Sequence, residues 1–322
     1  MFETPLSDAL PEELQTDLVY ALAATPDLGV GFAARVSGLY RSTDGCRTWQ
    51  PCYDSLELAE ALPTTSVVLA PDYDGDTHLN LLSGVPGGVL RSIDGAETWF
   101  AAILDSPPPA VSDLVISPNF SEDGVVLAAS TEDGIFRSAN HGSHWARWNF
   151  GLLDLNVFCL AMSPSFVEDE TLFAGVESGI FRSTNGGRAW REVEISVGYE
   201  PVLSIALSPA YAEDRVIYAG TESKGLLHSD DGGRTWTQME AAPIADPVNR
   251  IVLAPDYAEN PCILVLAESA LWLSRDAGET WVQVPDVPED ATAVLAPQGL
   301  EPGGPLLVGQ VGGEVSLLTL GV

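Results

Sequence analysis

The octapeptide Ser229-Asp230-Asp231-Gly232-Gly233-Arg234-Thr235-Trp236 is one of six copies of the same pattern in this chain. The other copies also end in tryptophan and span residues 42–49, 92–99, 138–145, 183–190 and 274–281. The closing tryptophans are therefore 45 to 50 residues apart. A nearly fixed period of this size predicts a series of similar supersecondary units packed side by side.

The octapeptide has the composition of a tight turn between two strands. Gly233 and its counterparts Gly142, Gly187 and Gly278 permit a positive φ without steric cost. The first serine and the Asp or Asn at the third place can hydrogen bond within the turn, and the tryptophan can bury its indole between units. The residues to which we assign this structural role are Ser42, Asp44, Trp49, Ser92, Asp94, Trp99, Ser138, Asn140, Trp145, Ser183, Asn185, Trp190, Ser229, Asp231, Trp236, Ser274, Asp276 and Trp281.

The sequence between the boxes predicts four short strands in each unit. In the middle units the first strand ends in Ala-Pro or Ser-Pro, and a third strand leads into the box. A seventh, partial unit stops where its box would begin. We therefore predict an all-β fold, a single seven-bladed β-propeller of four-stranded antiparallel blades over residues 1–322. The blades are expected at about 17–53, 63–105, 110–149, 155–195, 200–241, 247–286 and 290–322.

Two further expectations concern the ends and the spacing of the units. The seventh blade lacks a fourth strand of its own, so a strand from residues 1–16, around Phe2 to Leu6, is expected to complete it and close the ring. The insertion Tyr53–Pro63 accounts for the longest interval, and residues 55–62 within it are expected to form a short helix capped by Ser55.

Charge narrows the range of partners. The chain has 14 basic and 46 acidic residues, a formal net charge of −32. Such a surface disfavours nucleic acid and anionic membranes, whereas a basic protein or a cation fits better; solubility alone is the alternative explanation. No basic leader or apolar span is evident, so a cytoplasmic location is expected. The four cysteines are expected to be reduced and buried.

The boxes resemble the Asp-box family, also called bacterial neuraminidase repeats. The resemblance covers nearly the whole chain and implies hairpins on a β-propeller, as in sialidases, xyloglucan-cleaving glycosidases, sortilin-like receptors and photosystem II assembly factors. In that family the box is a structural hairpin away from the ligand site, so the resemblance implies a fold more than an activity.

Enzymatic activity is the alternative to a binding role. A sialidase-like site would need three arginines converging on a substrate carboxylate. Arg41, Arg91, Arg137 and Arg182 hold one repeat position and belong to the scaffold, while Arg35, Arg215 and Arg250 lie off the pattern. Another glycosidase would need two carboxylates at a defined separation. We assign no catalytic residue, and expect a non-enzymatic protein, with a glycosidase or carbohydrate-binding propeller as the alternative.

No metal site or cofactor is expected. Acidic residues recur in the loops after the first strands, for example Glu122 and Asp123, but calcium needs six to eight oxygen atoms converging on one point. One set of carboxylates per blade would instead be spread around a ring, which favours solvated turn residues over an ion site.

The departures from the repeat suggest where a partner binds. Glu132, Glu177 and Glu222 recur in the turns between second and third strands, on the face opposite the boxes. Trp148, Phe150 and Tyr199 lie in irregular links between units and are candidate anchors for a protein partner. For Trp148 and Phe150 the alternative is packing beneath those links. The sequence thus predicts an acidic scaffold that binds another protein through this face.

Overall fold

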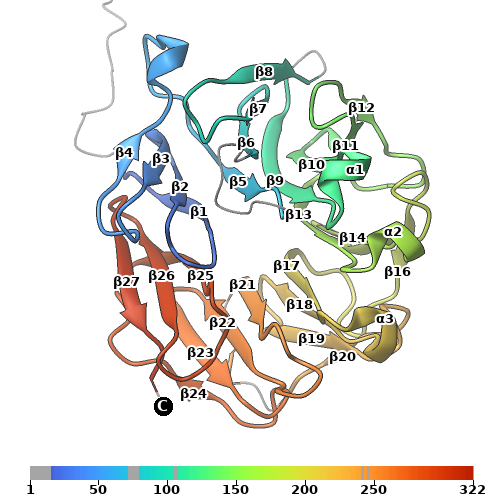
Figure 1. Ribbon diagram of the computed structural model, residues 1–322. Helices are drawn as coiled ribbons and strands as arrows, with labels where there is room; N and C mark the ends of the chain where they lie inside the picture. Colours follow the sequence, from blue (N-terminus) through green and yellow to red (C-terminus); the bar gives the residue numbers. More distant parts are fainter. Residues whose placement is uncertain (1–15, 72–79, 105–107, 241–242, 245–246, 322) are drawn as a thin grey trace, which may run out of the picture.

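Seven small antiparallel sheets surround one central axis in the computed structural model of the chain (Figure 1). The structure describes residues 16–71, 80–104, 108–240, 243–244 and 247–321. Within each sheet the strands are ordered as they occur in the chain, from the axis outwards. Six sheets have four strands and the last has three among the described residues. The predicted seven-bladed all-β propeller is confirmed.

The strands fall into four concentric rings. The innermost strands are β1 (Val19–Ala24), β5 (Ser66–Leu69), β9 (Ala110–Ile116), β13 (Val157–Met162), β17 (Val202–Leu207), β21 (Val248–Leu253) and β25 (Ala291–Leu295). The second strands are β2 (Gly31–Arg35), β6 (Leu81–Val85), β10 (Val125–Thr131), β14 (Leu172–Val176), β18 (Ile217–Thr221), β22 (Ile263–Ala267) and β26 (Pro305–Gln310). The third strands are β3 (Gly38–Ser42), β7 (Gly88–Ser92), β11 (Gly134–Ala139), β15 (Gly179–Ser183), β19 (Leu226–Ser229), β23 (Ala270–Ser274) and β27 (Val315–Thr319). The outermost strands are β4 (Gln50–Pro51), β8 (Phe100–Ile103), β12 (Ala146–Arg147), β16 (Arg191–Val193), β20 (Thr237–Gln238) and β24 (Val282–Gln283).

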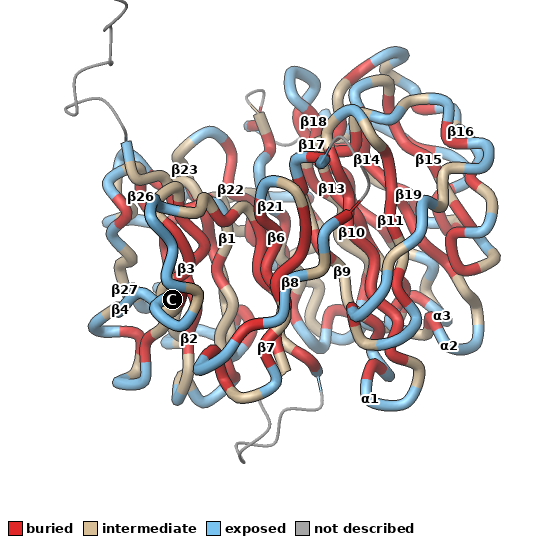
Figure 2. The backbone as a smooth tube through the Cα atoms, turned by 90° about the horizontal axis from the view of Figure 1, so that it is seen from above, coloured by how far each residue is buried: buried red, intermediate tan, exposed pale blue. Residues whose placement is uncertain are grey.

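Burial follows these rings because the blades pack face to face. Every residue of β14 and β22 is buried, since both faces of a second strand meet a neighbouring blade (Figure 2). Both residues of β20 are exposed, since the outermost strands form the wall of the molecule. The small apolar residues of the second strands, such as Ala174 and Ala219, allow this close packing.

The boxes form the predicted hairpins between third and fourth strands. The serine Oγ donates to the Asp or Asn Oδ1 at 2.8–2.9 Å in all six boxes. Gly232 and Gly233 have φ values of 80° and 76°, so two consecutive residues are left-handed. Cys46 (61°) and Ala96 (77°) adopt the same conformation without being glycine. The hydrogen bonds within the box therefore hold the turn even where glycine is absent.

Three four-residue helices lie on the same end of the propeller as the boxes: α1 (Phe120–Asp123), α2 (Phe166–Asp169) and α3 (Tyr211–Asp214) (Figure 2). The last residue of each helix is an aspartate. Its carboxylate accepts one hydrogen bond from the serine of the preceding Ser-Pro pair and another from a backbone N–H where the second strand begins. For Asp169 the two donors are the hydroxyl of Ser163 and the N–H of Thr171. These acidic loops are therefore hydrogen-bonded caps. None of the helices in the described parts of the chain could cross a membrane.

The insertion differs from its prediction. The structure has a 3-10 helix at Asp54–Leu56 instead of a helix over residues 55–62, and no side chain caps it. Tyr53 fixes the insertion, because its buried hydroxyl shares hydrogen bonds with Thr64 (3.0 Å) and Ser83 (2.8 Å). The insertion is thus held by one buried side chain, and helix propensity has little influence.

The first and seventh blades meet directly. Thr292 in β25 donates a hydrogen bond of 2.8 Å to the carbonyl oxygen of Val19 in β1. Gln298 donates another of 2.9 Å to the carbonyl oxygen of Pro26. The strand predicted around Phe2 to Leu6 lies outside the described residues. All four thiols are free; Cys46, Cys159 and Cys262 are buried as expected, whereas Cys52 is partly exposed.

Candidate binding site at the mouth of the central channel

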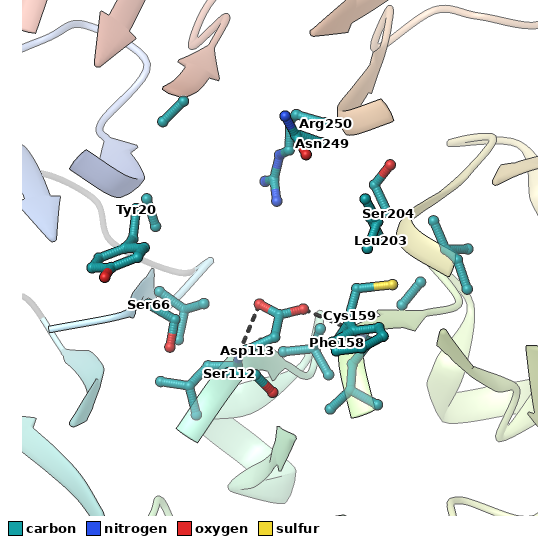
Figure 3. Close-up of a pocket in the computed structure, with 18 of the residues that line it drawn as sticks. Tyr20, Ser66, Ser112, Asp113, Phe158, Cys159, Leu203, Ser204, Asn249 and Arg250 are labelled. Carbon is teal, nitrogen blue, oxygen red and sulfur yellow. Dashed lines mark hydrogen bonds between the residues drawn. The ribbon is translucent and has the colours of Figure 1, made fainter. Parts of the chain in front are cut away.

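All seven innermost strands contribute to the wall of a central channel with a volume of about 410 Å³ (Figure 3). Its lining is mostly aliphatic and hydroxyl side chains. Asp113 and Arg250 are the two charged residues among the described residues of this lining. A concave site with a few converging polar groups is the usual form of a small-ligand pocket.

A β-bulge near the start of the innermost strand sets which side chains reach the channel. Six of the seven innermost strands shift register there, for example between Val202 and Ser204 and between Val248 and Arg250. The extra residue is Leu203 in β17 and Asn249 in β21. Bulges re-aim side chains and free backbone groups from the ladder. Because these strands begin at the end away from the boxes, the bulges lie near the mouth of the channel on that face.

In four blades a hydroxyl group near the start of the innermost strand joins the next blade. Its acceptor is the carbonyl oxygen of a valine at the start of the next innermost strand. The donors and acceptors are Thr65 to Val111 (2.6 Å), Ser112 to Val157 (2.6 Å), Ser204 to Val248 (2.8 Å) and Thr292 to Val19 (2.8 Å). In the sixth blade, Asn249 and Arg250 occupy the two positions that supply these hydroxyls elsewhere. Arg250 is therefore a departure from the repeat at a position that faces the channel.

Asp113 occupies the equivalent position of the third blade and is fixed by the backbone. Its two carboxylate oxygens accept the N–H of Leu114 (2.8 Å) and the N–H of Leu160 in the neighbouring blade (2.9 Å). Burial raises the pKa of Asp113 above 3.8. The hydrogen bond from Leu160 and the positive charge of Arg250 favour the ionised form and so partly offset this rise. Asp113 thus has a fixed orientation in the channel wall.

Arg250 lies across the channel, with its guanidinium directed towards Asp113 (Figure 3). The side chain is exposed to the channel. Among the described residues, none forms a hydrogen bond with the guanidinium or an ion pair within 4.0 Å. The five N–H donors of an arginine are strong ligands for carboxylates. Arg250 therefore presents an unused donor group to the channel.

The three off-pattern arginines lie in different surroundings. Arg35 is buried near Asp17 (4.0 Å), and its guanidinium lies over the ring of Tyr40. Arg215 lies over the ring of Tyr211 beside a box, and only Arg250 lines the channel. Among the described residues, fewer than three ligands of the His, Cys, Asp or Glu type gather at any one point that could hold a metal ion.

The predicted acidic rim lies at the same end as the channel mouth. Glu132, Glu177 and Glu222 are exposed in the turns after the second strands. The backbone N–H groups of Glu177 and Glu222 donate to carbonyl groups just before the innermost strands of the same blades, at Asn156 and Pro201. The structure thus brings these three glutamates to one face, opposite the boxes.

The three candidate anchors have different surroundings. Trp148 is half-buried, and its ring packs under the guanidinium of Arg137, 4.4 Å from the ring centre. Phe150 and Tyr199 expose 79% and 71% of their surface. Desolvation together with the charges of Glu177 and Asp154 raises the pKa of Tyr199, which places it beside the acidic rim. Gly187 and Arg188 of the box in the fourth blade also lie against the Trp148 ring. Trp148 therefore packs at the junction between the third and fourth blades, while Phe150 and Tyr199 remain available to a partner.

Sequence reasoning did not select Asp113 and Arg250 as site residues. A signal was present, because the innermost strands of the second to sixth blades align on their Ala-Pro or Ser-Pro ends. Four residues before that Ala or Ser, the second, fourth and fifth blades have the small residues Ser66, Cys159 and Ser204. At the same place the third blade has Asp113 and the sixth blade has Arg250. The β-bulge places this residue on the channel wall, and the sequence alone does not reveal the bulge.

The chain is similar to known proteins over part of its sequence and over nearly all of its structure. No protein-family model matches the chain. The xyloglucanase Xgh74A of Acetivibrio thermocellus is 29% identical over 157 residues, which is 42% of this chain and 16% of that protein. The chain therefore spans less than a fifth of the length of this curated relative.

Solved structures are similar over nearly the whole chain. The GH74 enzyme of Niastella koreensis superposes with a TM-score of 0.70 at 16% identity, covering 94% of this chain and 52% of that one. YCF48 bound to the D1 peptide superposes with a TM-score of 0.66 at 18% identity, covering 96% and 95%. YCF48 from Cyanidioschyzon merolae gives 0.66 at 15% identity, covering 97% of both chains. With six boxes and seven blades in place, the chain is a seven-bladed β-propeller of the Asp-box type, similar in fold to GH74 enzymes and to YCF48.

Proposed function

We propose that this propeller is a non-enzymatic scaffold that binds a basic protein through the face opposite the Asp boxes. The observation that carries the proposal is that Leu153 and Tyr199 are exposed on that face together with carboxylates. Tyr199 lies beside Glu177 and Asp154, as the effect of their charges on its pKa indicates. Aromatic anchors surrounded by polar groups are the usual centre of a protein interface.

The apolar part of the surface follows two links between blades. Phe150 and Leu153, in the link from the third to the fourth blade, expose 79% and 81% of their surface. Phe150 lies at the outer edge of this surface, because its carbonyl oxygen accepts the N–H of Trp190, the last residue of the box in the fourth blade. Tyr199, in the next link, exposes 71%. A partner that covers these large apolar side chains removes their surface from water, which favours binding.

The charge of the surface fits a basic partner. Glu132, Glu177 and Glu222 are exposed in successive blades, and the chain has a net charge of −32. Such a field accelerates association with a positive surface and weakens as salt is added. A structural neighbour that is bound to a peptide, YCF48, is consistent with protein binding by this fold.

The channel gives less support to a glycosidase. Hydrolysis of a glycosidic bond by the usual mechanism needs two carboxylates at a defined separation. Among the described residues of the channel lining, Asp113 is the single carboxylate, and two backbone N–H groups already hold it. The partial similarity to a xyloglucanase keeps glycan binding as the alternative outcome of the test.

The test is a pull-down from the source cell lysate with the tagged propeller and with the double variant Phe150→Ala, Tyr199→Ala. A matched control is Phe100→Ala, because Phe100 is also an exposed aromatic residue (58%) but lies on β8 of the second blade. We expect a basic protein that is retained at low salt, released at high salt, lost in the double variant and retained by the control. Equal retention by all three proteins, or binding of glycans without any protein, would refute the proposal.

A further inference from the structure

The geometry points to a second site, on the same face as the proposed protein-binding surface but built from other residues: Arg250 and Asp113 together bind a small zwitterion that carries an ammonium group and a carboxylate, such as a free amino acid. The ligand would lie in the mouth of the central channel, with its carboxylate on Arg250 and its ammonium group towards Asp113.

The two charges lie on opposite walls of the channel. Arg250 lies on β21 and Asp113 on β9, three blades apart, so they face each other across the channel (Figure 3). Each is the residue that follows the bulge of its strand, and the five other blades have alanine, serine or cysteine at the equivalent place. The structure therefore holds opposite charges on opposite walls of one cavity, separated by more than ion-pair distance.

Asp113 and Arg250 differ in how many of their hydrogen-bonding groups are already used. Asp113 already accepts two backbone N–H groups, which fix it in the wall. Each carboxylate oxygen has a further lone pair, and these can accept an ammonium proton. Arg250 has no hydrogen-bond partner for its guanidinium among the described residues, so its planar set of donors is free for the two oxygens of a carboxylate.

The charge of the surrounding surface favours a zwitterion over a plain anion. The mouth of the channel lies on the same face as Glu132, Glu177 and Glu222, and the whole molecule is strongly acidic. This field repels an anion that approaches from solvent. A zwitterion has no net charge, so it is not repelled, and it can satisfy Arg250 and Asp113 together. The volume of about 410 Å³ is sufficient for a molecule of this size.

The wall between the two charges also suits such a ligand. Leu203 and Phe158 occupy the bulge positions of their strands and lie on the channel lining between β9 and β21. Ser112 and Ser204 already donate their hydroxyl protons to backbone carbonyl groups. The charged ends of the ligand are therefore recognised by two residues, and its carbon chain meets an apolar wall.

The experiment is isothermal titration calorimetry with a series of zwitterions of increasing length: glycine, β-alanine and γ-aminobutyrate. Acetate and methylammonium carry one of the two charges each and serve as controls on the ligand side. We expect one zwitterion to bind at least tenfold more tightly than either control, and the best length reports the gap between the charges. Absence of heat for every zwitterion up to about 10 mM would overturn the proposal, because even weak specific sites bind in this range.

Variants test the two residues separately. Arg250→Gln should weaken the best zwitterion at least tenfold, whereas Arg234→Gln, an exposed arginine in a box at the other end, should leave its binding unchanged. Asp113→Asn should weaken the zwitterion but not acetate. If Asp113→Asn does not fold, the comparison of zwitterion with acetate in the parent protein still tests the role of the negative charge. Equal affinity for acetate and the zwitterions would show an anion site only and refute the assignment.

Discussion

The hydroxyl of Thr292 donates a 2.8 Å hydrogen bond to the carbonyl oxygen of Val19, although 273 positions separate the two residues. Val19 is fully buried, and its carbonyl is near the β-bulge of β1, where the ladder changes register. The same type of bond joins three other pairs of adjacent blades. Ring closure therefore uses the same contact as three of the other junctions, placed between the two ends of the described chain.

Thr292→Val tests this junction, because the substitution keeps the shape of the side chain and removes its hydroxyl. The carbonyl oxygen of Val19 would be left without that donor, and we expect a loss of about 1–2 kcal/mol in the free energy of unfolding. Urea denaturation followed by tryptophan fluorescence measures it. Thr237→Val is the control, since Thr237 is exposed and its hydroxyl bond is long at 3.4 Å. A loss of similar size in both variants would contradict a special role for the junction.

The boxes contain a pairing between their third and seventh residues. Where the third residue is aspartate, the seventh is threonine, and its hydroxyl donates to the second carboxylate oxygen, as Thr235 does to Asp231 at 2.8 Å. Where the third residue is asparagine, the seventh is His144 or Ala189. The amide of asparagine provides a donor in place of that second acceptor oxygen. The sequence of each box is therefore consistent with its own hydrogen bonds.

Asp231→Asn should lower stability and change its pH dependence. Burial opposes ionisation, but hydrogen bonds from Thr235 and Arg234 outweigh it and lower the pKa of Asp231 to about 2. The unfolded carboxyl group titrates near 3.8, so between these values the unfolded state binds more protons. Stability from this group is present above pH 4 and is lost as the pH falls towards 2.

The expected loss at neutral pH is about 1 kcal/mol, since a charge-assisted hydrogen bond becomes a neutral one. The variant should also lose less stability than the parent between pH 4 and pH 2, as measured by urea denaturation. Thr235→Ala should cost less when it is added to Asp231→Asn than when it is made in the parent, as the natural pair Asn185 and Ala189 suggests. Full additivity of the two substitutions would contradict the pairing.

The periodic boxes were sufficient to predict the fold, since each carries its own turn chemistry and the period sets the number of blades. The predicted helix over residues 55–62 was wrong for a physical reason. The insertion is held by the buried hydroxyl of Tyr53, a contact with the second blade that local propensity does not encode. The left-handed Cys46 was also hidden, because it occupies a place where glycine is expected.

The candidate site was less accessible to sequence reasoning. Glu177 and Tyr199 were selected because they depart from the repeat or recur at its loops, and they lie close together on one face. The channel residues Asp113 and Arg250 were not selected, since a β-bulge determines which residue of a strand faces the axis. A bulge depends on the pairing of two strands and on the approach of the next blade, so one strand considered alone does not reveal it.

The acidic rim can be tested by neutralising three glutamates at once. In Glu132→Gln, Glu177→Gln, Glu222→Gln we expect slower association with the retained basic partner at low salt, by about tenfold, and a weaker dependence of the association rate on salt. Surface plasmon resonance measures both rates. The control neutralises Glu122, Glu168 and Glu213, which are also exposed but lie in α1, α2 and α3 at the other end. The same slowing in both triple variants would show an effect of net charge alone.

The contribution of Asp113 to stability should depend on pH in the opposite direction to that of Asp231. This difference is a separate test of the burial of Asp113 in the channel wall. Burial raises its pKa above 3.8, although the Leu160 N–H and Arg250 oppose the shift, and Cys159 is its other titratable neighbour. Just above pH 3.8 the folded state therefore binds more protons than the unfolded state, and stability falls as the pH rises through this window.

Asp113→Asn cannot ionise, so the variant lacks this fall in stability. The difference in unfolding free energy between variant and parent should shift in favour of the variant as the pH rises from about 4 to about 7, as measured by urea denaturation. A shift in favour of the parent would mean that the hydrogen bonds and Arg250 outweigh burial, and that the carboxylate of Asp113 is stabilised in its charged form.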